Sequence, residues 1–201
     1  MVTRKNLKKK FALISVYDKK KLKYLCSNLS ENNYSFISSG STGERIRSLG
    51  FKSLDIAKVT KINQMFDGRI KTLNHLIYAS LLYVRDNNDH KKQFMSLKVP
   101  EIDIVVVNLY PFEKYIKKNE SKKIIEMIDI GGPSLLRAAS KNFNYITPVM
   151  FIEDYNKLIN NIKVNNGVTD IKFRRMMASK VFEEISKYDK LIAKWFNENK
   201  K

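Results

Sequence analysis

A glycine–proline turn between an acid and a base is the segment of this sequence whose residue types are best suited to chemistry. Asp129 precedes the pair Gly131-Gly132, Pro133 follows it, and Lys141 lies two helical turns further on. Glycines let a backbone approach a ligand closely, and a proline in the first turn of a helix presets its direction. The free N–H groups of that turn would face the ligand. A plain helix start with two packing glycines is the alternative interpretation.

A second segment, Ser39-Gly40-Ser41-Thr42-Gly43, combines hydroxyl groups with glycines ahead of a predicted helix. Hydroxyls and backbone N–H groups at a helix start are a usual way to hold a phosphate. The segment lacks the Gly-Lys-Ser/Thr ending of a Walker A loop. It therefore indicates phosphate binding without identifying the ligand, and a serine–glycine loop with no ligand is the alternative.

Two further segments add cations, an amide and a phenol. Arg69 and Lys71 stand two residues apart, so in extended backbone both would point to one side, where they suit a phosphate or an oxyanion. Asn108 and Tyr110 follow an apolar run that a proline ends, and there they could orient a carbonyl group. A solvated basic turn and simple aromatic packing of Tyr110 are the alternatives.

These distant segments need a scaffold that brings them together, and the hydrophobic pattern predicts one. Short apolar runs alternate with segments of helical period. The predicted strands are Phe11–Val16, Tyr34–Ile37, Ile102–Val107 and, at an edge because of Pro148, Tyr145–Phe151; the predicted helices cover 22–29, Glu44–Leu49 and Phe173–Phe196, and 86–98 is a solvated connector. The pattern indicates an α/β fold, doubly wound, with a mostly parallel sheet flanked by helices. Ligands bind such sheets at the carboxyl ends of the strands.

Composition narrows the class of protein. A chain of 201 residues is long enough for one well-buried domain, which we place at 1–201. No apolar stretch approaches the ~20 residues that span a bilayer. The single cysteine, Cys26, favours a reducing, cytoplasmic setting. His75 and His90 are the only histidines and have no ligand spacing around them, so we expect no metal, and without a Gly-x-Gly-x-x-Gly motif we expect no dinucleotide cofactor.

The formal net charge of +18 raises the question of a polyanionic partner. Lysines are spread along the chain rather than grouped on one helix, and asparagine and isoleucine are also abundant. A bias of the codons toward A and T explains this composition better than nucleic-acid binding does. We therefore regard a nucleic-acid partner as the weaker interpretation.

The motifs, taken in order, resemble the inosine monophosphate (IMP) cyclohydrolase domain of the bifunctional purine biosynthesis protein. The resemblance runs from Phe11 to Phe196 and leaves residues 1–10 as a basic N-terminal extension. It is carried by Ser15-Val16-Tyr17-Asp18-Lys19, Ser39-Gly40-Ser41-Thr42, Asp67-Gly68-Arg69-Ile70-Lys71-Thr72-Leu73, Val105–Phe112, Asp129–Pro133, Lys141-Asn142 and Tyr188–Ala193. Several specific motifs in one order make the resemblance strong.

The resemblance implies a fold similar to methylglyoxal synthase, a homodimer and no cofactor. It implies that 5-formamidoimidazole-4-carboxamide ribotide (FAICAR), a purine nucleotide precursor, closes its second ring and loses water to give IMP. The implied catalytic residues are Lys71, Tyr110, Asp129 and Lys141. The implied substrate-binding residues are Ser15, Lys19, Ser39, Gly40, Ser41, Thr42, Arg69, Thr72, Asn108, Ile130, Gly131 and Gly132. Asp129 and Lys141 would relay protons while Lys71 and Tyr110 steady the oxygen.

The chain departs from the family pattern at three positions. Tyr17 stands where serine or threonine is usual, Ser41 replaces a glycine, and Asn74-His75 stands where His-Pro is expected. None of these removes a proposed catalytic group, so the departures put substrate affinity in doubt rather than activity.

The length of the chain leaves open where the second activity of the bifunctional family is encoded. The bifunctional family continues into a folate-dependent AICAR formyltransferase domain that these residues do not encode, so that activity would belong to a separate partner or to a further part of a longer protein. The alternatives to a cyclohydrolase are a phosphate-eliminating lyase or a non-catalytic nucleotide sensor of the same fold, and a basic nucleic-acid-binding protein.

Overall fold

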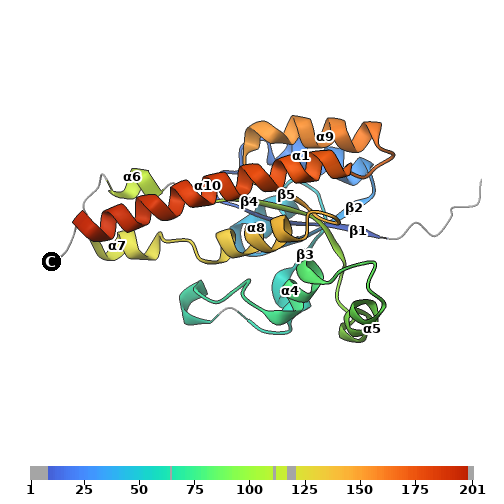
Figure 1. Ribbon diagram of the computed structural model, residues 1–201, viewed down its shortest axis with the longest axis horizontal. Coiled ribbons are helices and arrows are strands. Elements are labelled where there is room, and N and C mark those ends of the chain that lie inside the picture. Colours follow the sequence, from blue (N-terminus) through green and yellow to red (C-terminus); the bar gives the residue numbers. More distant parts are fainter. Residues whose placement is uncertain (1–8, 64, 111, 117–120, 199–201) are drawn as a thin grey trace, which may run out of the picture.

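Five parallel strands form one sheet within the described residues of this computed structural model, which are 9–63, 65–110, 112–116 and 121–198. The strand order is β3-β2-β1-β4-β5 (Figure 1). The strands are β1 Lys10–Val16, β2 Tyr34–Ser38, β3 Ser53–Asp55, β4 Ile102–Asn108 and β5 Thr147–Val149. The expected central strands are confirmed, and so is the edge position of the strand that contains Pro148.

Ten α-helices and two short 3-10 helices lie in the described part of the chain. They are α1 Leu22–Glu31, α2 Gly40–Ser48, α3 Ile56–Thr60, α4 His75–Leu82, α5 Asn88–Leu97, α6 Phe112–Ile116, α7 Ser121–Glu126, α8 Gly131–Lys141, α9 Tyr155–Val164, α10 Ile171–Glu198, η1 Phe66–Gly68 and η2 Ile152–Asp154. None of the described helices is both long enough and apolar enough to cross a bilayer.

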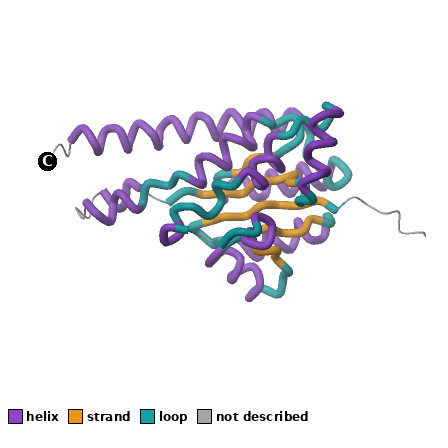
Figure 2. Tube along the Cα trace, turned by 90° about the horizontal axis from the view of Figure 1, so that it is seen from below, coloured by secondary structure: helices purple, strands orange, loops and turns teal. Residues whose placement is uncertain are grey.

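The sheet is covered on both faces, because alternate side chains of β1 and β4 point into two separate cores. Ala12 and Ile14 pack against α1 and α9, whereas Leu13 and Val105 pack against α3, α4 and α8. The doubly wound α/β prediction is therefore confirmed. Figure 2 shows α10 running past the sheet and continuing beyond it. The first turns of α10 pack in the core that contains Ala12, and its middle turns pack in the core that contains Leu13. Because α10 also contacts β5, it covers the edge of the sheet formed by that strand.

Two segments differ from the predictions. The connector predicted at 86–98 contains the helix α5, which Asn87 caps by accepting hydrogen bonds from the N–H groups of Asp89 and His90 at 2.9 and 3.0 Å. No residue of α5 is buried, so there was no apolar period to detect. The helix predicted from Glu44 begins at Gly40 instead, which places the Ser-Gly segment within its first turn.

Thr42 joins α2 to the end of β1. Its hydroxyl accepts a hydrogen bond from the Val16 N–H at 3.1 Å and donates one to the Val16 carbonyl at 3.0 Å. The side chain is buried, so neither backbone group has water as a substitute. This pair of bonds fixes where β1 ends and where α2 begins.

Replacing Thr42 by valine tests this connection. Thr42→Val keeps the shape but removes the side-chain acceptor of the buried Val16 N–H and one of the two side-chain donors to the Val16 carbonyl, the other being Lys19 Nζ at 3.2 Å. We therefore expect a loss of about 1–3 kcal/mol in the free energy of unfolding. Thr42→Ser is the matched control, because it keeps the hydroxyl and loses about 0.8 kcal/mol for the missing methyl group. Urea denaturation measures both variants. Equal losses for the two variants would show that the hydroxyl bonds do not stabilise the fold.

Candidate functional site

A cavity of about 580 Å³ lies at the carboxyl edge of the sheet. Its walls come from the loops after β1, β2 and β4, from the first turns of α2 and α8, and from the segment after η1. Among the predicted site residues, those that line it are Ser15, Lys19, Ser39, Ser41, Thr42, Arg69, Lys71, Thr72, Asn108, Tyr110, Asp129, Ile130, Gly131 and Gly132. The expected edge of the sheet is thus where the motifs meet.

The first turn of α2 forms an anion-attracting wall of the cavity. Ser39 precedes the helix in extended conformation and its side chain makes no capping bond, so the first N–H groups of α2 are available to a ligand. Gly40 has a φ of +51°, and a Cβ there would lie 2.5 Å from Lys71 Nζ. The positive φ favours glycine, and a side chain here would displace the Lys71 ammonium from the helix start. With glycine at this position, the positive charge lies beside the first N–H groups of α2.

The backbone that carries Arg69 and Lys71 to the cavity does not have the extended conformation predicted from the sequence. Arg69 has helical backbone angles, φ −61° and ψ −33°, so the segment is not extended there. Met65 and Ile70 form an isolated antiparallel bridge, which turns the chain back on itself. The turn continues into α4, where the Asn74 side chain accepts a hydrogen bond from Leu76 N–H at 2.9 Å and caps the helix. The departure at Asn74 therefore has a structural role.

Arg69 is paired with a carboxylate that sequence reasoning missed. Its Nε donates to Glu126 Oε2 at 3.2 Å, and its Nη2 donates to Glu126 Oε1. The bond to Arg69 lowers the pKa of Glu126 below its ordinary value. Both side chains are largely exposed, so the pair is weak in water and an incoming phosphate can compete for the guanidinium. No sequence signal connects positions so far apart.

Asp129 is held in a fixed orientation by the turn that it begins. Its Oδ1 accepts a hydrogen bond from Gly132 N–H at 2.8 Å. A Cβ on Gly132 would lie 2.5 Å from Asp129 Oδ2, and one on Gly131 would lie 2.7 Å from Thr72 Oγ1. The two glycines therefore allow the turn to pack against Asp129 and Thr72, in addition to letting a ligand approach the backbone. Burial raises the pKa of Asp129, and the Gly132 bond opposes that shift.

A second residue missed as part of the site, Tyr188, supports Asp129 from behind. The Asp129 N–H donates to the Tyr188 hydroxyl at 2.8 Å, and that hydroxyl donates to the Met127 carbonyl at 3.5 Å. Tyr188 belongs to α10, so the long helix is connected to the cavity wall. The sequence signal was present, since Tyr188 begins the last of the motifs that carried the resemblance.

Besides Arg69, three of the predicted ligand-binding side chains are already engaged within the protein. Lys19 Nζ donates to the carbonyls of Val16 and Tyr17. The hydroxyl of Thr42 is bonded to Val16. Asn108 Oδ1 accepts a hydrogen bond from Asp18 N–H at 3.0 Å, and its Nδ2 donates to the Asp18 carbonyl at 3.5 Å. All three residues line the cavity, but these contacts assign them first to holding the loop after β1 in place.

Lys141 is not brought to the other predicted catalytic residues. It is the exposed last residue of α8, whereas Asp129 precedes the first, and an eleven-residue helix separates its ends by about 15 Å. The neighbouring Asn142 side chain donates to the carbonyls of Leu81 and Tyr83 at the end of α4, at 2.9 and 3.0 Å, and none of these three residues lines the cavity. The predicted proton relay between Asp129 and Lys141 therefore has no basis within one chain. Among the described residues, no three His, Cys, Asp or Glu side chains gather as a metal site.

Comparison with known proteins gives two family matches in succession along the chain. A model described as MGS-like domain matches residues 21–134, and one described as AICARFT/IMPCHase bienzyme matches residues 139–201. The crystal structure of ForH is similar in fold, with a TM-score of 0.81 and 25% identity, and the match covers 92% of this chain and 98% of that one.

Curated relatives are similar over most of this chain but are much longer. The bifunctional purine biosynthesis protein PurH of Clostridium botulinum is 43% identical over 190 residues, which are 94% of this chain and 38% of that protein. PurH of Clostridium perfringens is 41% identical over 191 residues, with the same two coverages. PurH of Bradyrhizobium diazoefficiens is 38% identical over 187 residues, which are 92% of this chain and 35% of that protein. The chain spans little more than a third of the length of these relatives.

The half-buried carboxyl group of Asp129 predicts a pH dependence of stability. Because its pKa is raised above 3.8 in the folded protein, the unfolded chain releases this proton first as the pH rises. The free energy of unfolding therefore falls between 3.8 and the raised pKa. Asp129→Asn keeps the acceptor for Gly132 and cannot ionise, so we expect it to gain stability relative to the natural chain over this range.

Urea denaturation at several values between about pH 4 and pH 8 measures the difference. Asp89→Asn, at an exposed position of α5, is the control and should follow the natural chain. If Asp129→Asn also follows the natural chain throughout, the Asp129 carboxyl is not destabilised by burial.

Proposed function

Because this chain belongs to the family of MGS-like domains, we propose that its cavity binds a purine nucleotide and acts as an IMP cyclohydrolase. The substrate would be FAICAR and the products IMP and water. The observation that carries the proposal is the meeting of Lys71, Tyr110 and Asp129 in one cavity beside the first turn of α2. The match to the bienzyme model and the identity to the PurH proteins support it.

The phosphate of the nucleotide would bind at the first turn of α2. Unpaired N–H groups, the Ser39 and Ser41 hydroxyls and the Lys71 ammonium all lie there. A helix start and an ammonium together favour a dianion. The Arg69 guanidinium would exchange Glu126 for the ligand, since the exposed ion pair contributes little by itself.

Ring closure needs alignment and proton transfer rather than a cofactor. The carboxamide nitrogen attacks the formyl carbon of the same molecule, so holding the two groups in contact can supply roughly 7–11 kcal/mol. As the C–N bond forms, Asp129 would take the proton from nitrogen, while Tyr110 and Lys71 would donate to the formyl oxygen. The hydroxyl group and a second N–H proton then leave as water, and the C=N bond of IMP remains. A carboxyl whose pKa is raised by burial suits the transfer.

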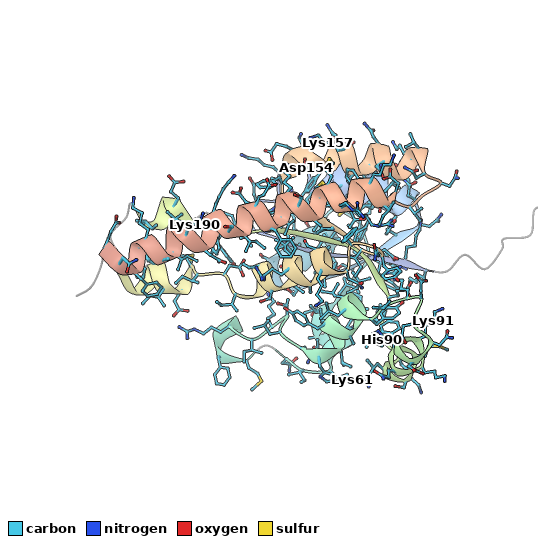
Figure 3. The ribbon with its side chains drawn as sticks, in the orientation of Figure 1. Lys61, His90, Lys91, Asp154, Lys157 and Lys190 are labelled. Carbon is cyan, nitrogen blue, oxygen red and sulfur yellow. The ribbon has the colours of Figure 1, made fainter. Side chains whose placement is uncertain are left out.

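We propose that these residues form a single domain that assembles as a homodimer in the cytoplasm. The formyltransferase activity would belong to a separate partner or to a further part of a longer protein. The sequence has one cysteine, the buried Cys26, which cannot form a disulfide within one chain, and this supports a reducing compartment. In Figure 3 the labelled Lys61, Lys91, Lys157 and Lys190 lie on separate segments, directly after α3, on α5, on α9 and on α10.

Conversion of FAICAR, followed by absorbance, tests the proposed activity. We expect Asp129→Asn and Lys71→Met to lower kcat by about 100-fold or more, because each removes a proton-transfer or oxyanion group. Lys23→Met, at an exposed position of α1, is the matched control and should keep the natural rate. IMP binding by the natural chain without conversion above the spontaneous rate would contradict the cyclohydrolase and favour a nucleotide sensor.

Lys141→Ala is a separate test, because the family resemblance and the structure disagree about this residue. From its place at the far end of α8 we expect less than about a threefold change in kcat, since its ammonium cannot reach Asp129 across the length of the helix. A loss as large as that of Asp129→Asn would show that Lys141 reaches a cavity by another route, such as the cavity of a second copy.

A further inference from the structure

Two tyrosine side chains form a pair at the cavity. The rings of Tyr17 and Tyr110 lie with their centroids 5.0 Å apart at an angle of 56°. Tyr17 comes from the loop after β1 and Tyr110 from the loop after β4, and both line the cavity. They are 44% and 42% exposed, so the pair is not part of a hydrophobic core. Its exposed ring surface is open to a ligand.

Hydrogen bonds fix the residues on both sides of Tyr17 in the loop after β1. Val16 before it is bonded to Thr42, and Asp18 after it is bonded to Asn108. Lys19 Nζ donates to the carbonyls of Val16 and Tyr17, at 3.2 and 3.1 Å. The backbone on both sides of Tyr17 is therefore fixed before any ligand arrives. A ring on such a backbone gives contact area at a low entropic cost.

The walls of the cavity differ in chemistry. The first turn of α2, Lys71 and Arg69 attract an anion. The tyrosine pair offers aromatic surface, and because its rings are tilted by 56°, a planar base that lies flat on one ring meets the other at an angle. A nucleotide has one group for each wall, its phosphate and its base. A phosphorylated sugar without a base has no group for the aromatic wall.

The geometry points to Tyr17 as a specificity-determining residue whose ring, together with that of Tyr110, packs against the heterocyclic base of the nucleotide. This inference rests on the proposed function and extends it to a residue outside the expected catalytic and binding set. Serine or threonine at position 17 would give the base no such surface. The departure at Tyr17 would then strengthen binding of the base rather than weaken binding of the phosphate.

Calorimetric binding of IMP and of ribose 5-phosphate tests the inference. For Tyr17→Ser we expect IMP to bind about tenfold more weakly, because stacking on an aromatic ring contributes roughly 1–3 kcal/mol per base. Ribose 5-phosphate should bind with unchanged affinity, within about twofold. Tyr17→Phe keeps the ring and should bind both ligands like the natural chain. Tyr24→Ser, an exposed tyrosine of α1 outside the cavity, is the control.

Several outcomes would overturn the inference. Equal weakening of both ligands by Tyr17→Ser would place the side chain at the phosphate, and unchanged IMP binding would show that the ring does not touch the base. Loss of IMP affinity in Tyr17→Phe would assign the effect to the hydroxyl. The readout is separate from turnover: unchanged IMP binding by Tyr17→Ser, in a protein whose natural chain converts FAICAR, contradicts this inference alone, whereas failure of the natural chain to bind IMP contradicts both proposals.

Discussion

The parallel register of β1 and β4 determines where the cavity lies in this fold. It sets Val16 opposite Asn108, so that both strands end at the same edge and their following loops face each other. β2 joins this edge because Ser38 pairs with Ile14. A one-residue slip would exchange the two faces of a strand, and both faces are buried here. The hydrophobic cores therefore fix the position of the cavity.

The hydrogen bonds at this edge tie each loop to its neighbour. Thr42 holds the end of β1 to the start of α2, Asn108 holds the loop after β1 to β4, and Tyr188 holds the start of the Asp129 turn to α10. The cavity wall is thus assembled from segments that are far apart in sequence, and each is anchored to a different element. Such anchoring places polar groups before the ligand arrives, which lowers the cost of ordering them on binding and in catalysis.

The sequence predicts the parts of this arrangement that have a local pattern. The buried strands around Leu13 and Val105 are visible as apolar runs, and Pro148 correctly indicates an edge. The exposed helix α5 has no apolar face, so its pattern could not be distinguished from a connector. Glu126 and Tyr188 act through partners distant in sequence, and no local rule identifies such pairs. Residues that are close in sequence can also lie far apart. Asp129 and Lys141 belong to one continuous segment, but they lie at opposite ends of α8.

We propose that the nucleotide binds at the edge of the sheet where α2 and α8 begin. NMR titration of isotope-labelled protein with IMP, followed by amide resonances, tests this placement. We expect the amides of Gly40, Ser41 and Thr42 and those of Gly131 and Gly132 to shift together in one saturable process, while those of α5 stay unchanged. Saturable shifts that cluster on α5 or α9 and spare the first turns of α2 and α8 would contradict it.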